Sequence, residues 1–247
     1  MRMISFARRC AKEILRDPLT LGFGLGFPLI LLLLLSAIQA NIPANAGPDV
    51  YEINQLTPGI SIFGLSFMTL FSATLIARDR ETSFLQRLYT TPLTGMEFIL
   101  GYMLPIFPIA LTQTLLCYLC AIPLGLNISI HIFYAMIGMI PIAFFYIAMG
   151  LLFGSILNVK QVGGICGALL TNLSAWLSGV WFDLELLGDT FGKIANFFPF
   201  IHAVEMEKAL FHGNFETVPG HLLPVILYSI FTTILAVLLF LRQMKKQ

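Results

Sequence analysis

The chain has 247 residues, of which 57% are hydrophobic and only 11% are charged, and its mean hydropathy is +0.87. Soluble domains average about 25% charged residues, so this composition excludes a soluble globular domain and indicates a membrane protein. The formal net charge of +1 gives no sign of a nucleic-acid partner, and we expect none.

Lysine and arginine gather in alternate gaps between six long uncharged stretches. Of the 14 basic residues, only Lys193 and Lys208 lie in the other gaps. Positive charge resists translocation, so cytoplasmic connections retain Lys and Arg. The pattern predicts a multi-pass protein of the cell (inner or plasma) membrane with both termini in the cytosol. Its inner positive excess should attract anionic membrane lipid.

The N-terminal segment before the first span is amphipathic. In Met3–Arg16 the apolar residues Ile4, Ala7, Ala11 and Leu15 share one side, and basic residues occupy the other. This spacing favours a helix that lies on the inner leaflet, with a disordered basic tail as the alternative.

Six spans are predicted, because about 20 apolar residues, each rising about 1.5 Å, cross the hydrocarbon core of a bilayer. Their approximate bounds are 19–39, 53–77, 98–122, 132–157, 162–182 and 222–241, after an interfacial helix at residues 1–18. The expected fold class is therefore an all-α membrane protein, with residues 1–247 in a single transmembrane domain.

One cytosolic connection, Arg80–Tyr89, is predicted to form a short helix. Phe84, Leu85 and Leu88 share one face of it, and polar residues populate the rest. Pro92 ends the helix, because proline disfavours the helical conformation of the residue before it.

The outer connection Asp183–His221 carries an aromatic cluster. Phe197, Phe198 and Phe200 surround Pro199 and precede a run of helical character. Three phenylalanines are poor material for a solvated loop, so we expect a re-entrant or interfacial element whose backbone is satisfied within the protein.

Several kinds of chemistry are missing from the sequence. No G-x-x-x-x-G-K-[ST] motif is present to hold ATP phosphates, and no catalytic constellation or metal-ligand spacing is recognisable. No ionisable group lies near the centre of a predicted span, where such groups are usually functional. We therefore expect neither an enzyme nor a cofactor or metal site in this chain, and uphill transport would draw its energy from a partner.

Small residues recur at four-residue spacing in Gly150-x-x-x-Gly154 and Gly163-x-x-x-Gly167. This spacing lets helices approach closely. Packing within the chain and dimerisation are both open interpretations of it.

The order of these features resembles the permease subunit of type-2 ABC exporters (the ABC-2 type transmembrane subunit). Arg16-Asp17-Pro18 is similar to the family's Arg-Asp-Pro entry to the first span, and Arg80–Leu93 to its cytosolic Glu-Arg-Glu-x-Gly-Thr-Leu-Glu-x-Leu-x-x-x-Pro stretch. Glu97-Phe98-Ile99-Leu100-Gly101 matches its Glu-x-x-x-Gly, and Asn196–Pro199 its outer element. The sequence departs from the family pattern at Ser83, where glycine is usual, and at Tyr102, where lysine is usual.

The resemblance implies a definite assembly. Two permeases, identical or homologous, would bind two separately encoded ATPase subunits that hold ATP and Mg, and would export drugs, lipids or lipid-linked glycans. The helix Arg80–Tyr89 would dock into the ATPase. The residues assigned to ATPase coupling are Arg80, Glu81, Phe84, Leu85, Arg87, Leu88, Pro92, Glu97 and Gly101. Those assigned to an outer gate or interfacial element are Phe197, Phe198, Pro199 and Phe200.

Two other functions are compatible with the sequence. One is an ATP-independent channel or facilitator, and the other is a membrane enzyme acting on lipid, for which no catalytic constellation is recognisable. A neighbouring gene for a soluble protein with a phosphate-binding loop would favour the exporter, because a channel needs no such partner.

Overall fold

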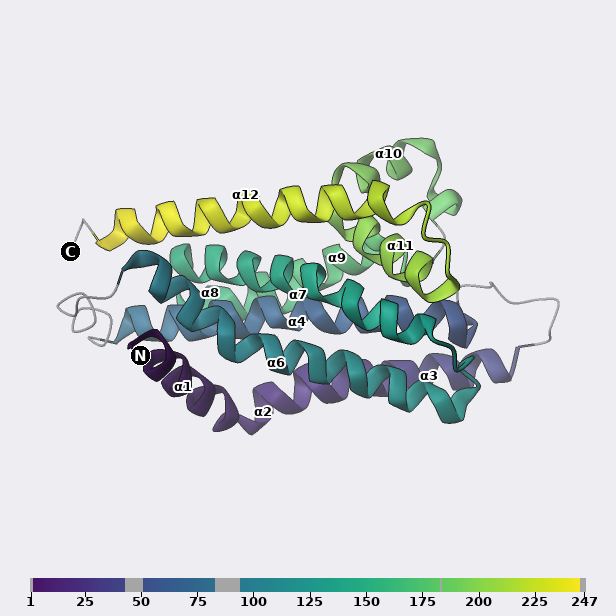
Figure 1. Cartoon of the computed structure of the whole chain (residues 1–247), viewed down its shortest axis with the longest axis horizontal. Helices are drawn as coiled ribbons and strands as arrows, with labels where there is room; N and C mark the ends of the chain where they lie inside the picture. The colour runs from purple at the N-terminus through teal and green to yellow at the C-terminus, as the bar shows by residue number, and fades with distance from the viewer. Residues whose placement is uncertain (1, 43–50, 83–93, 183, 245–247) are drawn as a thin grey trace.

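The computed structural model describes residues 2–42, 51–82, 94–182 and 184–244, and these ranges contain helices and connections but no strand (Figure 1). The helices are α1 (Arg2–Leu15), α2 (Pro18–Leu21), η1 (Gly22–Gly26), α3 (Phe27–Ala40), α4 (Ile53–Glu81), α6 (Gly95–Ala121), η3 (Ile122–Leu124), α7 (His131–Ile156), α8 (Val159–Val162), η4 (Gly163–Leu170), α9 (Thr171–Ser178), η5 (Leu184–Leu187), α10 (Asp189–Phe197), α11 (Pro199–His212) and α12 (Val218–Met244). The expected all-α class is confirmed.

Five helices are long and apolar enough to cross a membrane. They are Gly22–Ala40, Ile53–Glu81, Gly95–Leu124, His131–Ile156 and Val218–Arg242. Each of them overlaps one predicted span.

The predicted span at 162–182 has a different structure. It falls in the helical run α8–η4–α9, whose centre is π-helical and which ends where Gly179 takes the left-handed conformation, with φ of 72°. This run is not among the five long apolar helices. The number of six spans therefore stays a prediction.

Helix α4 is the centre of the bundle. Its most apolar window is 89% buried, against 17% for the first span and 22% for the last. Helices α3, α6, α7 and α11 all pack against it. The reason is its surface, which combines apolar residues with small ones and so lets neighbours come close.

Helices α4 and α7 approach each other closely. A Cβ at Gly150 would lie 1.8 Å from the hydroxyl oxygen of Ser72, and one at Gly154 would lie 2.6 Å from the carbonyl oxygen of Ala73. Ser72 also donates a hydrogen bond across the interface to the carbonyl of Ile147 at 3.1 Å. The spacing Gly150-x-x-x-Gly154 therefore serves packing within the chain. At Gly163, by contrast, an added Cβ would meet nothing within 4 Å.

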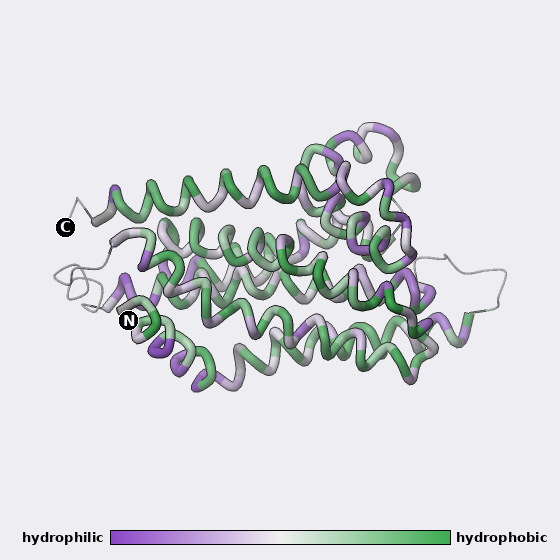
Figure 2. The backbone as a smooth tube through the Cα atoms, in the orientation of Figure 1, coloured by the Kyte–Doolittle hydropathy of each residue, from purple (hydrophilic) through white to green (hydrophobic). Residues whose placement is uncertain are grey.

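Both termini lie at one end of the bundle, with α1, α8 and the start of α6, while α10 and α11 lie at the other (Figure 1). Figure 2 shows hydrophilic residues concentrated on α1 and around α10 and α11, with long hydrophobic stretches between them. We call the end of the bundle that carries both termini the basic end, and the end that carries α10 and α11 the distal end. The end of α4 belongs to the basic end, since Glu81 contacts the first residue of α8.

Helix α1 forms as expected, and the side of it that packs on the bundle is not the side that carries Ile4 and Leu15. Ile4 and Leu15 are 61% and 66% exposed. The side that packs on the bundle, chiefly on α6, is shifted around the helix, because the aromatic ring of Phe6 and the thiol of Cys10 fill the interface. The buried residues of α1 are Phe6, Ala7, Cys10 and Ile14.

Candidate functional site

Arg80 and Glu81, predicted to begin a separate cytosolic helix, are instead the last two residues of α4. Their positions differ from the prediction because the apolar span continues without a break into the polar segment. After them Thr82 leaves the helical conformation, with φ −92° and ψ 153°. The other predicted coupling residues of this segment, Phe84, Leu85, Arg87, Leu88 and Pro92, lie outside the described residues.

The side chains of Arg80 and Glu81 tie α4 to the turn between α7 and α8. Arg80 donates to the carbonyl oxygens of Gly154 at 2.9 Å, in the last turn of α7, and of Leu157 at 3.1 Å, the C-cap residue of that helix. Glu81 accepts a hydrogen bond from the backbone N–H of Val159 at 2.9 Å. Arginine thus satisfies free carbonyls at a helix C-terminus, and glutamate a free N–H at a helix N-terminus.

Glu97 and Gly101 both act at the start of α6. Glu97 and Thr94 form a capping box, in which Thr94 N–H donates to Glu97 at 2.8 Å and Glu97 N–H donates to the Thr94 hydroxyl at 3.3 Å. At Gly101 an added Cβ would lie 2.4 Å from the ring of Phe6, so this position allows α1 to approach α6. Both residues shape the helix that follows the segment 83–93.

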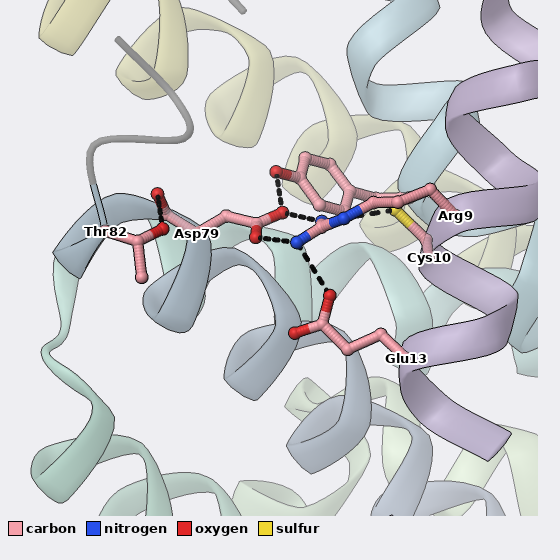
Figure 3. A network of polar contacts seen from close by, with 6 residues as sticks. Arg9, Cys10, Glu13, Asp79 and Thr82 are labelled. Carbon is pink, nitrogen blue, oxygen red and sulfur yellow. Dashed lines mark hydrogen bonds and ion pairs between the residues drawn. The ribbon is translucent and has the colours of Figure 1, made fainter. Parts of the chain in front are cut away.

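A buried ion pair next to these residues was not anticipated from the sequence. Arg9 of α1 donates to both carboxylate oxygens of Asp79 on α4, at 2.5 and 2.6 Å (Figure 3). Tyr102 of α6 donates to the same carboxylate at 2.8 Å. Asp79 is 1% exposed and Tyr102 is fully buried, so three helices meet at one carboxylate.

The surroundings of this pair favour its charged form. Burial by itself would lower the pKa of Arg9, but the hydrogen bonds and charge of Asp79 outweigh it, and the pKa of Arg9 is raised. Glu13 contacts Arg9 at 2.8 Å, although burial raises the pKa of Glu13. Burial also raises the pKa of Cys10 to about 12, which keeps the thiol protonated. The network is thus suited to joining helices, not to nucleophilic chemistry.

At the distal end the predicted aromatic element divides into an anchored and an exposed part. Phe200 is 4% exposed and packs against Phe145 and Tyr146 of α7, whereas Phe197 is 71% exposed. Pro199 is buried and begins α11, a favoured position for proline. Phe198 is half-buried and its ring stacks on that of Phe200, with centroids 6.2 Å apart. The four residues are together, but only one of the rings faces outward.

Two polar contacts fasten this element to α12. Tyr228 donates to the carbonyl oxygen of Phe197 at 2.6 Å. His202 of α11 lies between the carbonyl oxygen of Asn196, 3.0 Å from its Nε2, and Nδ1 of His221, 3.1 Å from its Nδ1. A carbonyl only accepts, so Nε2 of His202 donates to Asn196, and in the neutral pair His221 donates to His202.

A second buried carboxyl group belongs to α11, the helix that begins at Pro199. Glu207 of α11 is fully buried, and the hydroxyl of Tyr118 on α6 donates to its Oε1 at 2.7 Å. Its Oε2 has no hydrogen-bond partner among the described residues. Oε2 lies 3.1 Å from the place that a Cβ at Gly138 would occupy, so the glycine makes room for the carboxyl.

The family model described as "ABC-2 type transporter" matches residues 2–212. The chain belongs to the ABC-2 type transporter family. It is thus the transmembrane permease domain of an ABC transporter, and the resemblance in the sequence is confirmed. A comparison with functionally curated proteins found no match.

An ABC-2 membrane domain is a permease and is not itself catalytic. In residues 2–42, 51–82, 94–182 and 184–244, no group of three or more His, Cys, Asp or Glu side chains could hold a metal ion. The matched region of this ABC-2 permease runs from α1 to the end of α11 and does not include α12.

Four residues of these polar contacts in the ABC-2 permease were not identified as site residues from the sequence: Arg9, Asp79, Tyr102 and Glu207. The position of Asp79 in an apolar helix, directly after Arg78, resembled the edge of a polar loop. Tyr102 gave a signal, since it stands where the family usually has lysine. Glu207 gave none, because its burial depends on the packing of α11 against α4, α7 and α12.

Proposed function

We propose that this chain is the permease of an ATP-driven exporter and that separate ATPase subunits dock at its basic end, on the cytosolic side of the membrane. The contacts of Arg80 and Glu81 carry this proposal. They join α4 to α7 and α8 immediately before the segment 83–93, while Asp79 joins α4 to α1 and α6. A displacement applied at this end by ATPase closure would reach five helices together.

The assembly would contain two permeases, identical or homologous, and two ATPases, with six spans in each permease. The run α8–η4–α9 would supply the fifth span, adapted by its π-helical centre. The substrate class is amphiphilic: a drug, a lipid or a lipid-linked glycan. The exposed ring of Phe197 would lie at the exit, and the anchored ring of Phe200 would hold the element in place.

The test is substrate-stimulated ATP hydrolysis by the complex purified with its ATPase. We expect Arg80→Gln to abolish most of the stimulation while basal hydrolysis stays, because the end of α4 is no longer tied to α7. Lys160→Gln is the matched control: it removes the same charge from an exposed residue of α8 that has no polar partner among the described residues. It should leave the stimulation unchanged.

Equal stimulation in Arg80→Gln and the unmodified complex would contradict the proposed coupling route. Leu88→Asp gives a second, independent perturbation, since a charge pressed into an apolar groove of the ATPase should prevent docking. Transport that continues without any ATPase would instead support the channel.

A further inference from the structure

An open hollow of about 880 Å³ lies at the basic end, between α1, the start of α2 and the end of α4. Its wall is strongly basic. The basic side chains that line it are Arg8, Arg9, Lys12, Arg16 and Arg78.

The acidic side chains of the hollow are already occupied. Glu13 contacts Arg9 at 2.8 Å, and Asp17 contacts Arg78 at 3.2 Å. The remaining bases, which are Arg8, Lys12 and Arg16, are exposed and have no acidic partner among the described residues. Their four-residue spacing places Arg8 and Lys12 on one face of α1, and Arg16 follows directly after the end of that helix. Three uncompensated positive charges therefore face one side of the hollow, as an anionic ligand requires.

A second, apolar hollow of about 210 Å³ adjoins the first at Pro18, which lines both. It continues along η1 and α3, where it is lined by Gly22, Phe23, Phe27 and Ile30. Phe23 and Ile30 are 63% and 62% exposed. A basic hollow thus opens into an apolar one at the residue where amphipathic α1 gives way to an apolar span.

We propose that the two hollows together bind one anionic phospholipid. Arg8, Lys12 and Arg16 hold its phosphate, since guanidinium and ammonium groups make strong charge-assisted hydrogen bonds to phosphate oxygens. An acyl chain lies in the apolar hollow beside Phe23 and Ile30. Free phosphate would fill only the basic hollow, and an acidic protein surface would have no apolar chain to bury in the second one. A lipid fits both, and basic residues beside a span attract anionic lipids.

The experiment titrates the purified full-length chain in detergent with phosphatidylglycerol or phosphatidylcholine of identical acyl chains, and measures occupancy by native mass spectrometry. The chain should prefer phosphatidylglycerol. Arg8→Gln/Lys12→Gln should weaken phosphatidylglycerol binding about 25-fold, since each basic residue near an anionic surface contributes a factor of about five. The matched control Lys160→Gln/Arg242→Gln removes two exposed charges elsewhere at the basic end and should change the affinity less than about twofold on the same basis.

A pair of glycines tests the apolar hollow without any change of charge. An added Cβ would meet nothing within 4 Å at Gly22 or at Gly26, so leucine fits at both. Only Gly22 lines the hollow. Gly22→Leu should weaken phosphatidylglycerol binding about fourfold for each methylene group that it excludes, whereas Gly26→Leu should leave it unchanged.

Three results would overturn the proposal. The first is an equal loss of phosphatidylglycerol affinity in Arg8→Gln/Lys12→Gln and in the control Lys160→Gln/Arg242→Gln, which would indicate diffuse surface charge. The second is displacement of the lipid by millimolar inorganic phosphate together with no effect of Gly22→Leu, which would indicate a phosphate site. The third is that Arg8→Gln/Lys12→Gln leaves the lipid affinity unchanged but abolishes binding of the ATPase, which would assign the basic hollow to the ATPase. The lipid titration uses neither ATP nor ATPase, so its failure is separate from a failure of the proposed function.

Discussion

The two ends of this permease each bury one carboxyl group against a tyrosine of α6, but the other partners of the two carboxyl groups differ. At the basic end Asp79 accepts from Tyr102 at 2.8 Å, and at the distal end Glu207 accepts from Tyr118 at 2.7 Å. Asp79 also accepts from both terminal nitrogens of the Arg9 guanidinium, Nη1 and Nη2. Glu207 has no basic partner among the described residues, and one of its oxygens has no hydrogen-bond partner there.

The difference shows that burial alone does not decide the state of a carboxyl group. A bidentate arginine offsets the desolvation of Asp79, whereas burial raises the pKa of Glu207 well above its usual range and favours the neutral acid. At the basic end an ion pair therefore joins the helices, and at the distal end a hydrogen bond between neutral groups joins them. The ion pair should resist separation of its helices more strongly than the hydrogen bond between neutral groups does.

The largest effect is expected from removing the charge of Arg9, the cation that binds the buried Asp79. Arg9→Met should lower the free energy of unfolding by about 3–5 kcal/mol, because the buried Asp79 carboxylate then keeps the hydrogen bond from Tyr102 but has no cation to offset its charge. Denaturant-induced unfolding in detergent micelles measures it. Arg8→Met removes the same charge from an exposed neighbour and should change stability by no more than about 0.5 kcal/mol.

A rescue variant sharpens this prediction. Arg9→Met/Asp79→Asn removes both charges while an amide oxygen can still accept from Tyr102, so most of the lost stability should return. No recovery in the double variant would mean that the packing of Arg9, not its charge, joins α1 to α4.

An intermediate effect is expected from the two tyrosines. Tyr102→Phe removes a hydrogen bond to a charged group and should lower the free energy of unfolding by about 1.5–3 kcal/mol, whereas Tyr118→Phe removes a neutral bond and should lower it by about 0.5–1.5 kcal/mol. The two substitutions are chemically identical and lie in the same helix, so each is the control of the other. A larger loss for Tyr118→Phe would reverse the comparison between the ends.

The smallest effect is expected from Glu207→Gln at pH 5, where a neutral amide replaces a neutral acid and stability should change by less than about 1 kcal/mol. The pKa of Glu207 is raised on folding, so its contribution is fully present below the unfolded value of about 4.3 and is lost as the pH rises through the folded value. The unmodified protein should therefore lose stability relative to Glu207→Gln as the pH rises from 5 to 8. An unfolding series over this range measures the difference. Glu205→Gln, at a partly exposed neighbour, is the matched control, because it retains Glu207.

The long helices could be predicted from the sequence because their signal is local. The uncharged runs at 53–77, 98–122 and 132–157 correspond to α4, α6 and α7, with bounds that differ by a few residues where the helix continues into polar sequence. The run at 162–182 was harder, because Gly163, Gly164 and Gly167 weaken its helical signal and the segment forms π-helical turns there.

The details of the two ends could not be predicted in the same way. The cluster around Pro199 was recognised, but nothing in its sequence separates the buried Phe200 from the exposed Phe197. The residues of α1 that pack on the bundle could not be predicted, because periodicity weighs Leu15 as it weighs Ile14, and only the surface of α6 decides which of them is covered.

The sequence by itself determined the membrane class, the gathering of positive charge in alternate connections and the ABC-2 family, since each depends on residues close together in the chain. The tertiary structure alone decided which charges meet. Arg9 and Asp79 are 70 positions apart, and Tyr118 and Glu207 are 89 apart. A buried carboxyl group is stable only with a partner at hydrogen-bond distance or in its neutral form, and the folded bundle settles which of the two applies.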